Sequence, residues 1–316
     1  MTEMRRLGNT GPEISTVGFG AWAAGGPWLV GWGAQDDNDS IAAMRCSLEA
    51  GCNWIDTAAI YGLGHSEEVV GRAIEGLPRE SVFVATKCGR TPDPTGKPQG
   101  NLRPAHIREE MEGSLRRLKT EYVDLYQIHW PDMDTGTPLE ESWATLVKLK
   151  EEGKARYLGV SNFNAEQLAL CHAIHPITSL QPPYSLLRRE MEAEVLPWCL
   201  ENGVGVIVYS PMQAGLLSGK FDMARVAEDD WRRRNPYFQE PNLTKNLAFV
   251  ERLRPIAARH GKTVGQLAIR WTLSHSAVTA AIVGARSTEQ VEANAQAMGW
   301  ELSAQDLHDI QAAYEA

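Results

Sequence analysis

N-W-I-D-T-A-A-I-Y-G at residues 53–62 is followed by two similar runs, V-F-V-A-T-K at residues 82–87 and V-D-L-Y-Q-I-H at residues 123–129. Each contains a short apolar stretch, as expected of a strand buried on both faces of a parallel sheet. Ionisable side chains lie at or just beyond the strand ends, namely Asp56, Tyr61, Lys87 and His129. The runs therefore predict successive βα units that bring four reactive groups to one rim.

The same alternation of apolar run and amphipathic segment continues along the chain and indicates its fold. A hairpin is predicted at about residues 4–17, and the first buried strand, V-G-F-G-A-W, begins at Val17. Eight strands, each followed by a helix, in 316 residues favour an α/β fold that is a closed (β/α)8 TIM barrel, over an open doubly wound sheet. No shift in composition divides the chain, so residues 1–316 are interpreted as one barrel domain with an extra C-terminal helix.

Helices are expected where apolar residues recur with a period near 3.6 residues. The first helix is expected to start at a capping Asp39 or Ser40, and the second has Ser66 as its expected N-cap. The predicted helical spans are 39–50, 65–76, 104–119, 138–153, 164–175, 191–203, 247–260, 264–274, 288–298 and 303–314.

Three connections are longer than usual, at residues 23–37, 88–103 and 211–246. All three follow predicted strand C-termini, which form the active face of such a barrel. Surface loops without a function are the alternative, but three on one face favour a substrate rim. Flat aromatic walls suit sugars and aromatic aldehydes, and the candidate substrate-binding residues are Trp22, Trp28, Trp32 and Trp130.

The net charge, the apolar runs and the cysteines argue against several kinds of partner and indicate the cellular compartment. The net charge of −9 argues against nucleic acid or an anionic membrane as the main partner. No apolar run is long enough to span a bilayer, and the N-terminal residues lack the apolar core of a signal peptide. Five scattered cysteines fit a reducing cytoplasm and argue against structural zinc, so no metal site is expected.

The four strand-end side chains suit general acid–base chemistry at a carbonyl or an alcohol. A phenol has a pKa near about 10, and the ammonium of Lys87 is expected to lower that of Tyr61. Asp56 would keep Lys87 charged, and His129 would orient a substrate oxygen. Each residue alone has an ordinary structural explanation, but together they favour a site.

This set resembles the Asp–Tyr–Lys–His tetrad of the aldo-keto reductases, which are NAD(P)(H)-dependent (β/α)8 enzymes. The motifs W-I-D-T-A-x-x-Y-G with Glu67, V-F-V-A-T-K, D-L-Y-Q-I-H-W and G-K-A-R-Y-L-G-V-S-N-F carry the resemblance, which covers nearly the whole chain. It implies that Tyr61 is the general acid in reduction and the base in oxidation. The resemblance is to the bacterial-type branch of this family, which includes potassium-channel β-subunit-like members. A cofactor-binding regulatory subunit is therefore the alternative function.

The resemblance also implies a cofactor site. Ser161, Asn162 and Gln181 would bind the nicotinamide carboxamide, and Tyr209 would stack on the ring. Backbone N–H groups of residues 215, 216 and 218 would face the phosphates, and Arg286 would bind a 2′-phosphate, so NADP(H) is expected over NAD(H). The full set is Gly20, Ala21, Trp22, Ser161, Asn162, Gln181, Tyr209, Ser210, Pro211, Met212, Gly215, Leu216, Ser218, Lys220, Gly284, Arg286, Gln290 and Asn294.

Other patterns in the chain are interpreted as structural. The G-F-G-A-W-A stretch at residues 18–23 is not followed at once by a helix, as a Rossmann fingerprint requires. His172 and His175 are three apart on a predicted helix but have no further ligand nearby. The W-R-R-R stretch at residues 231–234 is interpreted as a solvated loop, with cofactor-phosphate contact as the alternative. The substrate is predicted only as a small carbonyl compound or sugar.

Overall fold

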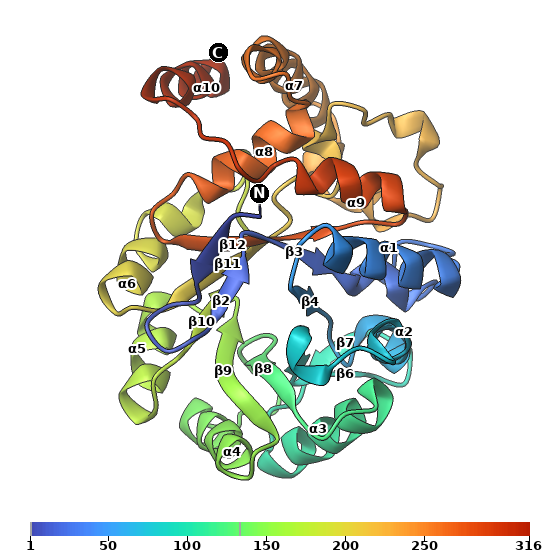
Figure 1. Cartoon of the computed structure of the whole chain (residues 1–316), viewed down its shortest axis with the longest axis vertical. Coiled ribbons are helices and arrows are strands. Elements are labelled where there is room, and N and C mark those ends of the chain that lie inside the picture. Colours follow the sequence, from blue (N-terminus) through green and yellow to red (C-terminus); the bar gives the residue numbers. More distant parts are fainter. Residues whose placement is uncertain (1, 133) are drawn as a thin grey trace.

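A closed barrel of eight parallel strands forms the centre of the computed structural model, which describes residues 2–132 and 134–316 (Figure 1). Neighbouring strands follow the order β10-β11-β12-β3-β4-β5-β8-β9, and β9 pairs with β10 to close the ring. The strands are β3 (Val17–Gly20), β4 (Trp54–Asp56), β5 (Phe83–Cys88), β8 (Val123–Ile128), β9 (Ala155–Ser161), β10 (Ser179–Gln181), β11 (Gly205–Tyr209) and β12 (Val278–Gly284). The predicted TIM barrel is confirmed.

Helices surround the barrel; seven of the eight named next connect one barrel strand to the following one, and α9 comes after the last strand, β12 (Figure 1). They are α1 (Asp37–Glu49), α2 (His65–Ile74), α3 (Pro104–Leu118), α4 (Leu139–Glu151), α5 (Ala165–Ile174), α6 (Val195–Glu201), α8 (Val264–Leu273) and α9 (Thr288–Ala295). Two further helices, α7 (Asn242–Arg259) and α10 (Ala304–Glu315), pack against each other outside this ring. None of the helices in the described ranges is long and apolar enough to cross a membrane.

The predicted N-terminal hairpin is present and closes one end of the barrel. Strands β1 (Met4–Arg6) and β2 (Glu13–Ser15) are antiparallel. Leu7 and Ile14 are fully buried in one apolar cluster with Trp54 and Leu125 from the barrel strands. Burying a side chain of this size contributes roughly 1.5–3 kcal/mol, so the hairpin stabilises the barrel interior.

Trp54 explains why a glycine is required in the first strand of the barrel. A Cβ atom on Gly18 would lie 2.0 Å from Cε2 of the Trp54 indole, which no side chain can tolerate. The indole crosses the barrel interior and donates from Nε1 to the carbonyl oxygen of Ser15 at 2.9 Å. Close packing of this ring against β3 therefore links β4 to the hairpin strand β2.

Both predicted N-caps differ from those in the structure. Helix α1 begins at Asp37, and Asp36 caps it by accepting a hydrogen bond from the backbone N–H of Asn38 at 2.7 Å. Ser66 lies inside α2, whose N-cap position is Gly64. The Ser66 hydroxyl is buried and donates to the carbonyl oxygen of Ala21 at 2.7 Å. It therefore joins α2 to the turn that follows β3 rather than capping its own helix.

Three other segments differ from the prediction, and in the first of them closely spaced Pro and Gly residues concealed short strands. The connection at residues 88–103 contains a second hairpin, β6 (Arg90–Pro92) with β7 (Pro98–Gly100). The helix expected at 191–203 is shorter, with a 3-10 turn at Glu190–Glu192 before α6. Helix α7 starts at Asn242, within the connection predicted at 211–246, which also holds four 3-10 turns.

Candidate active site

The four strand-end residues are brought together as the alternation of strands predicts. Asp56 is the last residue of β4, Lys87 lies one residue before the end of β5, and His129 directly follows β8. Tyr61 opens a 3-10 turn, η2 (Tyr61–Gly64), just beyond β4. Because β4, β5 and β8 are parallel neighbours, their C-terminal ends meet at one edge of the barrel.

Lys87 is the centre of this group. Its Nζ lies 2.6 Å from Oδ1 of Asp56, 2.8 Å from the carbonyl oxygen of Thr57 and 3.3 Å from the hydroxyl of Tyr61. These contacts use all three N–H donors of the ammonium. Lys87 is 1 % exposed and Asp56 is 3 % exposed, so this ion pair is buried. The position of the ammonium beside the phenol is therefore fixed from three sides.

Burial dominates the electrostatics of the group. Desolvation raises the pKa of Tyr61 more than the Lys87 charge lowers it, so the phenol titrates above its usual value. The Lys87 charge lowers the Tyr61 pKa, as expected, but by less than burial raises it, because the buried phenolate loses its water shell. Burial also opposes the charge of Lys87, yet Asp56 and Tyr61 raise the Lys87 pKa overall. For His129, burial with the Lys87 and Arg90 charges holds the pKa well below its usual range, so the imidazole is neutral at pH 7.

The second oxygen of Asp56 binds two glutamine side chains. Gln181 Nε2 donates to Asp56 Oδ2 at 2.8 Å and to Gln127 Oε1 at 3.3 Å, and Gln127 Nε2 lies 3.5 Å from Asp56 Oδ2. Gln181, proposed from sequence as a cofactor ligand, is thus also a direct partner of the tetrad. Gln127 was missed by the sequence analysis, although a polar residue within the apolar run V-D-L-Y-Q-I was a usable signal.

Three of the residues expected at the nicotinamide lie beside His129 in one hydrogen-bonded chain. Tyr209 OH donates to Asn162 Oδ1 at 2.8 Å, and Asn162 Nδ2 donates to the carbonyl oxygen of His129 at 3.0 Å. Ser161 Oγ donates to the carbonyl oxygen of Gln181 at 2.7 Å. Asn162 has a φ of 64°, a left-handed conformation that asparagine tolerates better than most residues. These contacts join the ends of β8, β9, β10 and β11 around a common point.

The turn that carries Tyr61 rests on the backbone of the preceding loop. The 3-10 turn η1 (Ala21–Gly25) follows β3, and its last residue contacts Gly62. A Cβ atom on Gly62 would lie 2.1 Å from the carbonyl oxygen of Gly25, and one on Gly25 would lie 2.8 Å from the Gly62 nitrogen. Only glycine fits at both positions, so the two backbones set the height of Tyr61 above the barrel.

Three tryptophans form a wall next to Tyr61. We refer to Trp22, Trp32 and Trp231 as the Trp22 cluster. The Trp22 ring centre lies 5.5 Å from that of Trp32, 5.8 Å from that of Trp231 and 6.2 Å from that of Tyr61. The indole N–H groups of Trp22 and Trp231 are buried, and neither has a hydrogen-bond partner among the described residues.

The composition of this wall differs from the set proposed from the sequence. Trp231 was missed because its neighbours Arg232, Arg233 and Arg234 made the segment resemble a solvated loop. In the structure the Arg232 guanidinium lies 4.8 Å from the Trp32 ring centre, so this stretch packs against the rim. Within the described part of the chain, neither Trp28 nor Trp130 makes an aromatic contact with the cluster, and Trp130 is 42 % exposed.

Residues 215–218, whose backbone N–H groups were expected to face the cofactor phosphates, use these groups in hydrogen bonds within the protein. The backbone N–H groups of Gly215, Leu216 and Ser218 donate to the carbonyl oxygens of Met212, Gln213 and Gly215 at 3.0–3.1 Å, within and beside the 3-10 turn η5 (Leu216–Ser218). They are therefore not free to bind phosphate in this conformation. The expectation overlooked that a 3-10 turn uses these donors internally. The Lys220 side chain is exposed and remains a candidate cation beside this turn.

Arg286, Gln290 and Asn294, which belong to the expected set of cofactor-binding residues, lie around the start of α9. The backbone N–H of Arg286 donates to Gln290 Oε1 at 2.8 Å, and Asn294 Nδ2 donates to the carbonyl oxygen of Gly284 at 3.3 Å. Gly284 is paired with Gly20 across β12 and β3, so this end adjoins the rim. Gly20, Gly284, Arg286, Gln290 and Asn294 therefore lie at one end of the barrel, and their role in cofactor binding stays a prediction.

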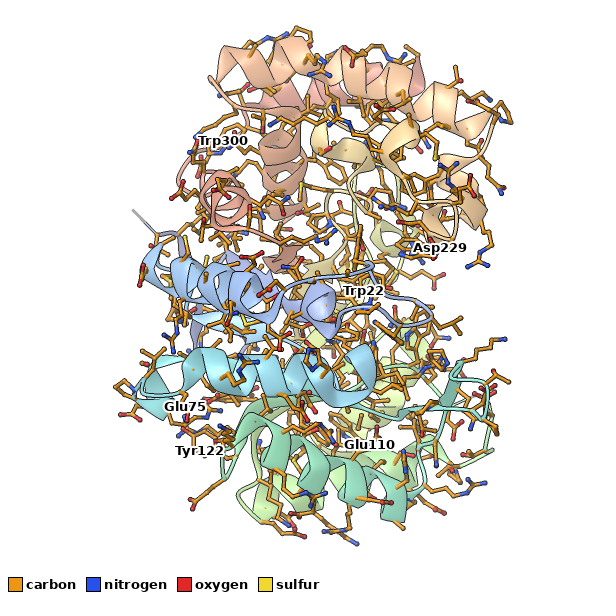
Figure 2. The ribbon with its side chains drawn as sticks, turned by 90° about the vertical axis from the view of Figure 1, so that its right-hand side faces the viewer. Trp22, Glu75, Glu110, Tyr122, Asp229 and Trp300 are labelled. Atoms are coloured by element: carbon orange, nitrogen blue, oxygen red, sulfur yellow. The ribbon has the colours of Figure 1, made fainter. Side chains whose placement is uncertain are left out.

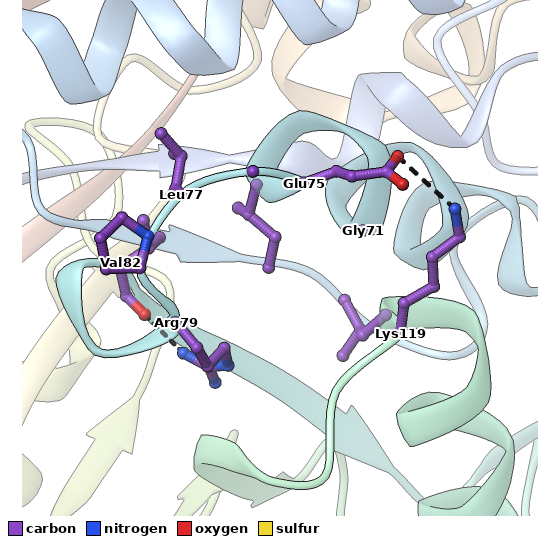
Figure 3. Close-up of a pocket in the computed structure, with 10 residues that line it drawn as sticks. Gly71, Glu75, Leu77, Arg79, Val82 and Lys119 are labelled. Carbon is purple, nitrogen blue, oxygen red and sulfur yellow. Dashed lines mark hydrogen bonds and ion pairs between the residues drawn. The ribbon is translucent and has the colours of Figure 1, made fainter.

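A cavity of about 240 Å³ lies away from this rim and is not part of the site (Figure 3). It is lined by residues at the C-terminal ends of α2 and α3, among them Leu77, Arg79 and Lys119. Glu75 and Tyr122, near this end, lie at the left of Figure 2, and Trp22 lies near its middle. No group of three or more His, Cys, Asp or Glu residues suited to a metal occurs in the described ranges.

The sequence model of the Aldo/keto reductase family matches residues 16–315. The chain belongs to this family. The chain is 40 % identical over 311 residues to aldo-keto reductase YhdN of Bacillus subtilis, covering 98 % of this chain and 92 % of the relative. It is 38 % identical over 313 residues to an NADH-specific methylglyoxal reductase of Escherichia coli, covering 95 % of this chain and 94 % of that protein.

Solved structures agree with this assignment. The glycerol dehydrogenase of Gluconobacter oxydans superposes with a TM-score of 0.88 at 39 % identity, covering 98 % of this chain and 94 % of that one. An aldo-keto reductase from Bacillus halodurans, in its holo form, superposes with a TM-score of 0.82 at 30 % identity over 99 % of this chain and 96 % of the other. The protein is therefore an oxidoreductase that uses a nicotinamide cofactor.

Proposed function

We propose that this enzyme interconverts an aldehyde, ketone or sugar lactol with its alcohol or lactone, using NADP(H), with Tyr61 as the proton donor and acceptor. The observation that carries the proposal is the distance of 3.3 Å between the buried Lys87 ammonium and the Tyr61 hydroxyl. A cation held at the phenol stabilises the negative charge that develops as the proton leaves.

The nicotinamide would supply or accept the hydride, and the side chains would handle the proton and the geometry. Tyr61 donates its proton to the carbonyl oxygen in reduction and takes it back in oxidation. His129, neutral because of its low pKa, donates a hydrogen bond that orients this oxygen. Asp56 keeps Lys87 charged and in place through the 2.6 Å ion pair.

The residues at the rim fit a nicotinamide carboxamide. Gln181 uses its N–H groups toward Asp56 and Gln127, and its amide oxygen has no hydrogen bond within the described ranges. That oxygen can accept from a carboxamide NH₂ group. Ser161 Oγ donates to the backbone carbonyl oxygen of Gln181, and Asn162 Nδ2 donates to Ser161 Oγ. Tyr209 is half-buried at the end of β11 and offers its ring as the stacking surface.

For the phosphate-bearing end, we propose that Arg286 binds the 2′-phosphate of NADP(H). Arg286 precedes α9, where the helix dipole disfavours a bare cation and favours one neutralised by a bound anion. The methylglyoxal reductase relative is named as NADH-specific, so the preference needs a direct test.

The wall at the Trp22 cluster suits a small substrate that carries hydroxyl groups. Two buried indole N–H groups without partners favour oxygen atoms as ligands, because an unpaired buried donor costs free energy. The proposal therefore favours hydroxylated carbonyl compounds or sugars over purely apolar aldehydes.

Stopped-flow oxidation of bound NADPH by a panel of aldehydes, ketones and sugar lactols tests the proposal. Tyr61→Phe should slow the step about 10²–10⁴-fold while leaving NADPH affinity nearly unchanged. Tyr122→Phe, at the other end of the barrel beside Arg79, should not change the rate. If no compound gives Tyr61-dependent oxidation, the alternative of a cofactor-binding regulatory subunit is favoured.

A further inference from the structure

The side chain of Arg286 is held by the loop that precedes α1. Its Nε donates to Gln35 Oε1 at 2.7 Å, and its Nη2 donates to the carbonyl oxygen of Ala34 at 2.5 Å. Gln35 Nε2 returns a hydrogen bond of 3.2 Å to the carbonyl oxygen of Arg286. We refer to these three contacts as the Gln35–Arg286 latch. They join segments that are 251 residues apart in the sequence.

The latch occupies the edge of the guanidinium that suits a phosphate. Nε and Nη2 form one of the two planar forks through which arginine binds an oxyanion with two parallel hydrogen bonds. Here both donors point to neutral oxygens, of Gln35 and Ala34. A phosphate forms charge-assisted bonds that are about twice as strong as neutral ones. It can therefore replace these partners, but only by breaking the latch.

We propose that Gln35 determines cofactor specificity by competing with the 2′-phosphate of NADP(H) for Arg286. This inference rests on the proposed phosphate role of Arg286. NAD(H) has no 2′-phosphate, so it leaves the latch closed. NADP(H) binding opens it, and part of the binding free energy is used for that opening. The affinity ratio of the two cofactors is therefore set by Gln35 as well as by Arg286.

Opening the latch also acts on the substrate wall. Trp32 lies in the same loop and contacts both Trp22 and Trp231, with ring centres 5.5 Å and 5.9 Å away. On the other side the loop is anchored at Asp36, the N-cap of α1. When the latch opens, residues 34–35 are therefore free to move together with the part of the loop near Trp32, while helix α1 stays in place.

Isothermal titration with 2′,5′-ADP and 5′-AMP tests the competition, because these probes differ at the 2′-phosphate. Gln35→Ala should bind 2′,5′-ADP about three- to tenfold more tightly, about 1 kcal/mol, with 5′-AMP affinity unchanged. Gln35→Glu should weaken 2′,5′-ADP binding at least about tenfold, because a carboxylate forms the stronger bond to Arg286. Asn38→Ala, an exposed change in the first turn of α1, is the matched control and should alter neither affinity.

Arg286→Ala separates failure of this inference from failure of the phosphate role. If Arg286→Ala weakens both probes equally, the phosphate role itself is wrong. If it weakens only 2′,5′-ADP while both Gln35 variants match the wild type, the competition is overturned and the phosphate role stands. As a second readout, backbone hydrogen exchange over residues 28–36 should be faster in the NADP⁺ complex than in the NAD⁺ complex. Equal exchange in the two complexes overturns the opening of the latch.

Discussion

Asp56 and Lys87 form an ion pair of 2.6 Å whose side chains are 3 % and 0 % exposed. Removing one partner of a buried pair leaves an uncompensated charge and typically costs about 3–5 kcal/mol. We expect Lys87→Met to lower the free energy of unfolding by about this amount. The double variant Asp56→Asn/Lys87→Met should recover part of the loss. Urea unfolding of the two variants measures the difference.

A surface ion pair provides the control for this prediction. Arg254 and Glu251 are 2.7 Å apart, but their side chains are 49 % and 63 % exposed. Glu251→Gln should therefore leave the urea unfolding midpoint almost unchanged. A loss in Lys87→Met no larger than in Glu251→Gln would contradict the buried-pair interpretation.

The raised pKa of Tyr61 predicts opposite pH dependence for the two directions of the reaction. The phenol stays protonated through neutral pH, so reduction, which needs the acid form, should be independent of pH from about 6 to 9. Oxidation needs the phenolate, so its rate should increase with pH over the same range. Single-turnover rates at saturating cofactor measure both profiles. A reduction rate that declines with a midpoint near neutrality would show that another group controls the proton.

Trp231 is expected to contribute to substrate binding and not to cofactor binding. Its ring stacks on Trp22 at 5.8 Å, and such pairs contribute about 0.5–1.5 kcal/mol beyond the area that they bury. Trp231→Ala should raise KM for the best substrate about three- to tenfold, with NADPH affinity unchanged. Trp300→Phe is the control, since Trp300 stacks on His260 and lies away from Trp22 in Figure 2. A change confined to NADPH affinity would instead assign Trp231 to the cofactor.

Glu110 on α3 predicts a loss of stability with increasing pH. Burial raises its pKa from 4.5 to about 8, against the hydrogen bond it accepts from the Gly89 N–H at 2.7 Å. Between these values the folded state holds a proton that the unfolded chain has lost. The free energy of unfolding therefore decreases from about pH 4.5 to about pH 8, by on the order of a few kcal/mol.

Glu110→Gln isolates this effect because an amide keeps the acceptor and cannot ionise. The difference in unfolding free energy between Glu110→Gln and the wild type should grow from pH 5 to about pH 8 and then level off. Urea unfolding at several pH values measures it. A difference that is constant over this range would mean that Glu110 is not protonated in the folded protein.

The barrel and the tetrad were predictable because they follow from periodicity. Buried parallel strands require apolar runs, and parallel neighbours place the residues that end them at one rim, as for Asp56, Lys87 and His129. Features that depend on tertiary contact were not predictable in this way. Ser66 has the composition of an N-cap but bonds to the Ala21 carbonyl oxygen of another loop. Trp231 was hidden among three arginines, of which Arg232 packs on the Trp32 ring.

The site was predictable in identity more than in detail. The residues predicted to bind the nicotinamide and adenosine were named from motifs, and the structure places them around the rim. Their mutual hydrogen bonds were not foreseen, because sequence spacing does not show that Gln181 reaches Asp56 across the barrel at 2.8 Å. The sign of the Tyr61 pKa shift also depends on burial, which only the packed structure reveals.

The contact between Gly25 and Gly62 marks a boundary between the turn that holds Tyr61 and the loop that follows Gly25. The turn η1, which ends at Gly25, supports the turn of Tyr61. The loop from Gly26 onward, which carries Trp32, does not take part in that support. Gly26 has a φ of 69°, and a Cβ atom there would meet nothing within 4 Å. Exchange of residues 26–35 should therefore change the wall around Trp32 and leave Tyr61, the proposed proton donor, in place. The contact between the two glycines thus separates a loop that can vary from the turn that holds Tyr61.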